Sequence, residues 1–177
     1  MEKEKYSKNR VAAIRVEPYL AEYARAKFDI DTKTGGIKIP DSFDLYHCVW
    51  QLMERKPAYV ALPDEPNLKI WLPARRATDG LAQKNPAFWN YLSPRSARQV
   101  ERSLRRLFNW EFHHYVDEAT GDGSRTTKLQ AVRDFIRKYG LNIDCEDALL
   151  KNIQRHENTL RVFLGIKKKK KKKNRYF

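Results

Sequence analysis

The stretch 93–118, SPRSARQVERSLRRLFNWEFHHYVDE, decides the fold of the second half of this chain. Ser93 is a good helix N-cap and Pro94 suits the first helical position, so a long helix is predicted to begin here. Its apolar residues recur at helical spacing and form one stripe that is expected to face the core. That stripe consists of Ala97, Val100, Leu104, Leu107 and Phe108.

Five arginines occupy the opposite side of this helix, on an arc of roughly 100°: Arg95, Arg98, Arg102, Arg105 and Arg106. Like charges three or four residues apart destabilise a helix by about 0.2–0.5 kcal/mol per pair. The one acid among them, Glu101, lies at the edge of the arc. Such a face indicates a negative partner, and phosphate suits the planar guanidinium best. An acidic patch elsewhere in the protein is the alternative.

A helical hairpin is predicted to follow. Thr126 or Thr127 can cap its first helix, and Gly140 suits the left-handed position just past its end. The inward stripe of that helix is Leu129, Val132, Phe135, Ile136 and Tyr139. After the turn 140–143, Asp144 is predicted to cap a second helix that begins at Cys145 and runs toward Leu164. Its predicted inward residues are Leu149, Ile153, Leu160 and Phe163.

Two helices joined by a short glycine-containing turn are typical of a helix-turn-helix, whose second helix enters the major groove of DNA. The outer face of the second helix carries side chains that can bind base edges. These are Lys151, Gln154, Arg155 and Asn158. Many helical hairpins bind nothing, so a purely structural hairpin is the alternative.

The N-terminal part mixes short strands and helices. Strands are predicted at 11–16, 37–39, 59–62 and 68–72, with a helix opened by Pro18 and another capped by Asp41 or Ser42. We therefore expect an α+β, predominantly helical fold. Residues 1–75 form a mixed α/β part, 76–92 a linker or capping loop, 93–166 a helical nucleic-acid-binding part, and 167–177 a disordered basic tail.

The charge of the chain favours a polyanionic partner. Lys and Arg total 36 against 22 Asp and Glu, which gives a net charge of +14. Removing the eight positive charges of the tail leaves +6 for the body. Seven of them are Lys167, Lys168, Lys169, Lys170, Lys171, Lys172 and Lys173. Like charges without apolar residues cannot fold alone, so the tail is interpreted as a phosphate-binding arm or, alternatively, a solubility tail.

Signals for catalysis or membrane insertion are weak. No phosphate-binding loop, dinucleotide motif or nucleophile elbow occurs, so no enzyme activity and no cofactor are predicted. His114 and Glu118 could hold one edge of a metal site, but no third ligand has the right spacing, and no metal site is predicted. Cys48 and Cys145 have no nearby cysteine, the N-terminus is polar, and no apolar stretch has the length of a membrane span. The cytoplasm is the expected location.

Two segments resemble small proteins carried on prophage-like and mobile elements of gut Bacteroidota. They are residues 85–98, NPAFWNYLSPRSAR, with the helix to Asp117, and residues 146–152, EDALLKN. The runs 35–40 (GGIKIP) and 138–141 (KYGL) are similar to features of the Mor family of phage transcription activators, although they lie farther apart here. The resemblance implies a phage-type DNA-binding regulator.

Together these patterns predict a non-enzymatic DNA-binding protein, a regulator or an accessory of a mobile element, that could form a homodimer. RNA binding is the first alternative. A structural or interaction protein whose basic face meets an acidic partner is the second.

Overall fold

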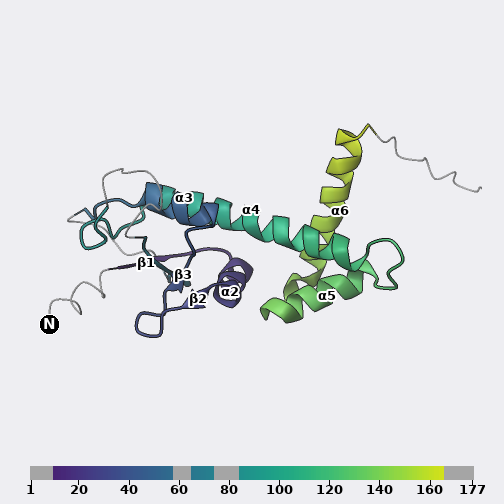
Figure 1. Ribbon diagram of the computed structural model, residues 1–177, viewed down its shortest axis with the longest axis horizontal. Coiled ribbons are helices and arrows are strands. Elements are labelled where there is room, and N and C mark those ends of the chain that lie inside the picture. Colours follow the sequence, from purple (N-terminus) through teal and green to yellow (C-terminus); the bar gives the residue numbers. More distant parts are fainter. Residues whose placement is uncertain (1–9, 58–64, 74–83, 166–177) are drawn as a thin grey trace, which may run out of the picture.

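The computed structural model describes residues 10–57, 65–73 and 84–165. Within these ranges the chain has a mixed α+β, mostly helical fold, which confirms the predicted class. Helix α4 (Pro94–Ala119) runs along the long axis of the molecule (Figure 1). The sheet and helices α2 (Pro18–Lys27) and α3 (Asp44–Leu52) lie beside its N-terminal half. Helices α5 (Lys128–Tyr139) and α6 (Glu146–Phe163) lie beside its C-terminal half.

Among the described residues, the sheet has four strands in the order β1-β4-β3-β2. Strands β1 (Val11–Ile14) and β4 (Leu68–Trp71) are antiparallel, β3 (Ile37–Lys38) is parallel to β4, and β2 (Asp29–Ile30) is antiparallel to β3. Side chains alternate along β1 and β4, so one face of the sheet is buried. The predicted strands at 11–16, 37–39 and 68–72 are confirmed. Strand β2 was not predicted, and 59–62 lies outside the described residues.

Helix α2 (Pro18–Lys27) follows β1 in the chain, and helix α3 (Asp44–Leu52) follows β3. Pro18 opens α2 as predicted, whereas the predicted cap of α3 by Asp41 or Ser42 is wrong. The N–H of Phe43 bonds the carbonyl of Pro40, and this turn keeps both polar residues outside the helix.

A lysine in the loop before α4 caps the C-terminal end of α3. The Lys84 ammonium donates to the carbonyl oxygens of Trp50, Gln51 and Met53 at 2.8, 2.9 and 3.0 Å. These carbonyls belong to the last turn of α3 or follow it directly, where helical partners are lacking. Lys84, in the described part of the segment 76–92, therefore caps the C-terminal end of α3.

One hydrophobic core joins the two parts of the chain. Phe108 of α4 is fully buried and meets Tyr19 and Tyr23 of α2 edge-on, with ring centroids 5.1 Å apart in both pairs. Its ring also lies 5.7 Å from that of Phe135 of α5. The predicted stripe is confirmed at Val100, Leu104 and Phe108, whereas Ala97 and Leu107 are partly buried.

A polar cluster around Glu111 holds three helices together. The Glu111 carboxylate accepts hydrogen bonds from the hydroxyls of Tyr23 on α2 and Tyr139 on α5, and pairs with Lys27 of α2 at 2.7 Å. Burial disfavours the charged carboxylate, but these three bonds outweigh it and hold the pKa of Glu111 below its usual value. The cluster therefore fixes α4 relative to α2 and α5.

Candidate nucleic-acid interface

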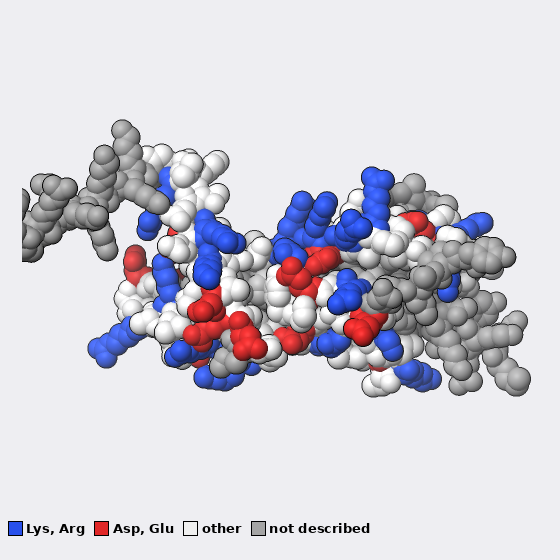
Figure 2. Space-filling model, turned by 180° about the vertical axis from the view of Figure 1, so that it is seen from behind, with Lys and Arg blue, Asp and Glu red and all other residues white. Residues whose placement is uncertain are grey.

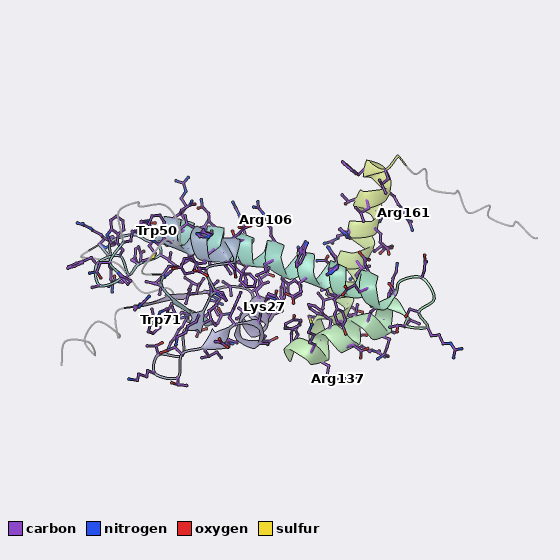
Figure 3. All side chains as sticks on the ribbon, viewed as in Figure 1. Lys27, Trp50, Trp71, Arg106, Arg137 and Arg161 are labelled. Atoms are coloured by element: carbon purple, nitrogen blue, oxygen red, sulfur yellow. The ribbon has the colours of Figure 1, made fainter. Side chains whose placement is uncertain are left out.

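Four of the five predicted arginines form an exposed face on α4. Arg95, Arg98, Arg102 and Arg106 are exposed, and none of them forms an ion pair within the described part of the chain. Arg106 projects from the side of α4 from which α6 rises (Figure 3). We call these four residues the arginine face.

Arg105 differs from the arginine face. Its guanidinium pairs with Glu17 at 2.9 Å and with Glu101 at 3.0 Å, so its charge already has partners inside the protein. Burial lowers the pKa of Arg105, but the contacts with Glu17, Tyr19 and Glu101 together outweigh it and hold the pKa above its usual value. The Glu17 partner belongs to the N-terminal part, and helical spacing alone gives no sign of it.

Sequence reasoning missed Trp110, which extends the arginine face. Residues 98, 102, 106, 110 and 114 follow one another at four-residue spacing, so their side chains are neighbours along the helix surface. Trp110 is 67% exposed, and the His114 ring stacks on its indole with centroids 5.6 Å apart. His114 Nε2 also lies 3.3 Å from a carboxylate oxygen of Glu118. No group of three or more potential metal ligands occurs among the described residues.

The predicted helical hairpin is present. Thr127 caps α5 by accepting a hydrogen bond from the N–H of Gln130, and Gly140 ends the helix in a left-handed conformation with φ +58°. A short 3-10 turn, Ile143–Cys145, contains Asp144, so α6 begins at Glu146 and the predicted Asp144 cap is wrong. Leu129 lies in the first turn of α5 and is 38% exposed, not inward as predicted.

Helix α6 presents its predicted polar face to solvent. Lys151, Gln154 and Arg155 are exposed and Asn158 is partly exposed, whereas Leu149 and Ile153 are buried on the opposite side. The C-terminal half of α6 projects beyond α4 and α5 (Figure 1). The prediction that Leu160 and Phe163 point inward is therefore wrong: they are 42% and 86% exposed.

A polar contact sets the position of α6 on α4. The rings of His113 and His156 stack with centroids 3.8 Å apart. Asn152 of α6 bonds His113 Nε2 at 2.6 Å through Oδ1 and donates to Asn109 at 3.1 Å. Asn109 and His113 are one turn apart on α4, so α6 is anchored where the arginine face ends.

Acidification is expected to destabilise the protein through His113. Burial is the largest effect on the pKa of His113 and lowers it, and the neighbouring His156 lowers it further. These two effects outweigh those of Asn152 and Asp117, which raise the pKa. Below about pH 6.5 the unfolded chain then binds more protons than the folded one, so stability present at higher pH is lost as the pH falls. Urea unfolding at pH 7.5 and 5.5 measures this loss. His113→Gln should reduce the difference between the two pH values, and an unchanged difference would contradict the assignment.

On the side of the molecule shown in Figure 2, Lys and Arg side chains project from the upper edge and also lie along the lower edge, with Asp and Glu side chains between them. The seven tail lysines, 167–173, lie outside the described residues. The described helices include none that is both long and apolar enough to cross a membrane.

Comparisons with known protein families, curated proteins and solved structures each give no match to this chain.

Proposed function

We propose that this protein binds nucleic acid without catalysing a reaction. The arginine face contacts phosphates, and α6 acts as the recognition helix of a helix-turn-helix on duplex DNA. The observation that carries the proposal is the row of four exposed arginines on α4, none of which forms an ion pair within the described residues. Arg106 of this row projects from the side of α4 from which α6 rises (Figure 3). Like charges at this spacing weaken a helix, so a bound polyanion supplies the missing partner.

We also propose a cellular location, an oligomeric state and a biological role for the protein. Cys48 and Cys145 are both free thiols, which fits a reducing cytoplasm. The exposed apolar end of α6, with Val162 at 81% and Phe163 at 86% exposure, fits a homodimer contact. The lysine tail adds further phosphate contacts, and a role as a transcription regulator or mobile-element accessory accords with these properties.

Competition binding tests the proposed class of partner. A labelled duplex is displaced by unlabelled duplex DNA, structured RNA or polyglutamate at equal charge concentration. We expect both nucleic acids to displace the label well and polyglutamate to displace it poorly, because the guanidinium fork fits phosphates. Stronger displacement by RNA would favour the RNA alternative, which the exposed Trp110 also supports. Displacement by polyglutamate alone would contradict the proposal.

Substitution of the α6 face is expected to reduce sequence preference. Gln154→Ala or Arg155→Ala should weaken binding to a preferred duplex, selected from a random library, by about 1–3 kcal/mol, and weaken binding to random duplex much less. Arg137→Ala on α5 is the control, since Arg137 is exposed and paired with Asp134 at 3.1 Å. Equal losses on both duplexes would show that α6 does not bind base edges.

A further inference from the structure

A cavity of about 570 Å³ opens beside the arginine face, between the start of α3 and the middle of α4. This volume lies within the range that small-molecule and cofactor sites occupy. Its walls include the aromatic rings of Phe43 and Trp110 and the side chain of Arg106. Ser42, Asp44 and Ser103 also line it.

The composition of the walls matches the chemistry of a nucleobase. An exposed indole offers a flat surface for stacking, and base–aromatic stacking is how proteins hold single strands without reading a duplex. His114 stacks on Trp110 with the two ring planes 22° apart. The Asp44 carboxylate and the Ser42 hydroxyl can accept the N–H donors of a base edge, whereas the Ser103 hydroxyl lies 3.3 Å from Cys48 Sγ.

The row of arginines supplies the matching backbone contacts. Arg106 lines the cavity, and Arg102 and Arg98 follow it along α4 at steps of four residues, or about 6 Å along the helix axis. A nucleotide whose base enters the cavity would therefore place its phosphate near Arg106. Its neighbouring phosphates would lie beside the other two arginines.

We propose that this cavity binds one unpaired base of a single-stranded segment of DNA or RNA, with Trp110 stacking on the base and Arg106 binding its phosphate. The inference rests on the proposed nucleic-acid binding and adds a second form of ligand, an unpaired nucleotide, to the duplex. Bases in an intact duplex are stacked on their neighbours and cannot enter such a cavity, so the site selects unpaired nucleotides.

Binding of two single strands of equal length and charge tests the site. One is a 15-nucleotide oligothymidine, and the other carries abasic residues throughout, so that both present the same phosphates. We expect the wild-type protein to bind the base-bearing strand about tenfold more tightly. Trp110→Ala should remove this preference, and Trp110→Phe should retain most of it. Arg106→Ala should weaken binding to both strands.

The outcomes separate this inference from the proposed function. Equal binding of both strands by the wild type, or a base preference that survives Trp110→Ala, would overturn the cavity site and leave phosphate binding standing. Failure to bind either strand or any duplex would overturn both proposals. Trp110 is mostly exposed, so Trp110→Ala should keep the wild-type melting temperature, and a thermal melt verifies this.

Discussion

Replacing Phe108 by alanine is expected to lower the free energy of unfolding by about 3–5 kcal/mol, the range for a large buried aromatic ring. Phe108 has no exposed surface and packs on rings from both α2 and α5. Its loss would therefore leave a cavity where the two parts of the chain meet. Since whole domains are stable by about 5–15 kcal/mol, the variant should be close to unfolding. Urea unfolding followed by circular dichroism measures the change.

Phe88→Ala is the matched control for this prediction. It removes the same ring from a site that is 65% exposed, so its effect should stay near zero. If the two variants lose similar stability, the shared core does not hold the parts of the chain together. Two separate unfolding transitions in the wild-type protein would contradict the shared core as well.

The triple variant Arg98→Ala/Arg102→Ala/Arg106→Ala is expected to bind duplex DNA roughly 100-fold more weakly than the wild type at 0.1 M salt. The physical reason is the loss of about three phosphate contacts and of the counterions that they release. The same variant should melt at an equal or higher temperature, because alanine favours helix and like-charge repulsion at four-residue spacing disappears. Fluorescence anisotropy and a thermal melt measure the two effects.

A second triple variant controls for net charge. Lys128→Ala/Arg133→Ala/Arg137→Ala also removes three positive charges, but from α5, where each cation is paired with an acid. It should keep most of the binding, since the contacts on α4 remain. Equal losses in the two variants would mean that overall charge, and not the arginine face, attracts the nucleic acid.

Local signals in the sequence predicted much of the helical part. Ser93, Thr127 and Gly140 each act within one helical turn, and the structure confirms all three. Their chemistry depends on neighbours a few residues away, so the sequence alone carries it. The arginine face follows from helical spacing for the same reason.

Contacts between distant segments set the limits of the sequence analysis. Glu17 reaches Arg105 and Tyr23 reaches Glu111 only when α2 packs on α4, and Tyr139 reaches Glu111 only when α5 packs there. Helical spacing placed Leu160 and Phe163 on the same side as Leu149, but it cannot tell where the neighbouring helices end. The cavity beside Trp110 needs α3 and α4 side by side, and the one local sign of it was a tryptophan in line with the arginines.

The salt dependence of binding, compared between the wild type and the arginine-face triple variant, tests the central claim most directly. Each phosphate contact contributes about −0.9 to the slope of log K against log salt concentration on duplex DNA. We predict a steep slope for the wild type and a slope shallower by roughly three contacts for Arg98→Ala/Arg102→Ala/Arg106→Ala, with the α5 triple variant close to the wild type. A wild-type slope near zero, or one that the arginine-face substitutions leave unchanged, would contradict phosphate binding by α4.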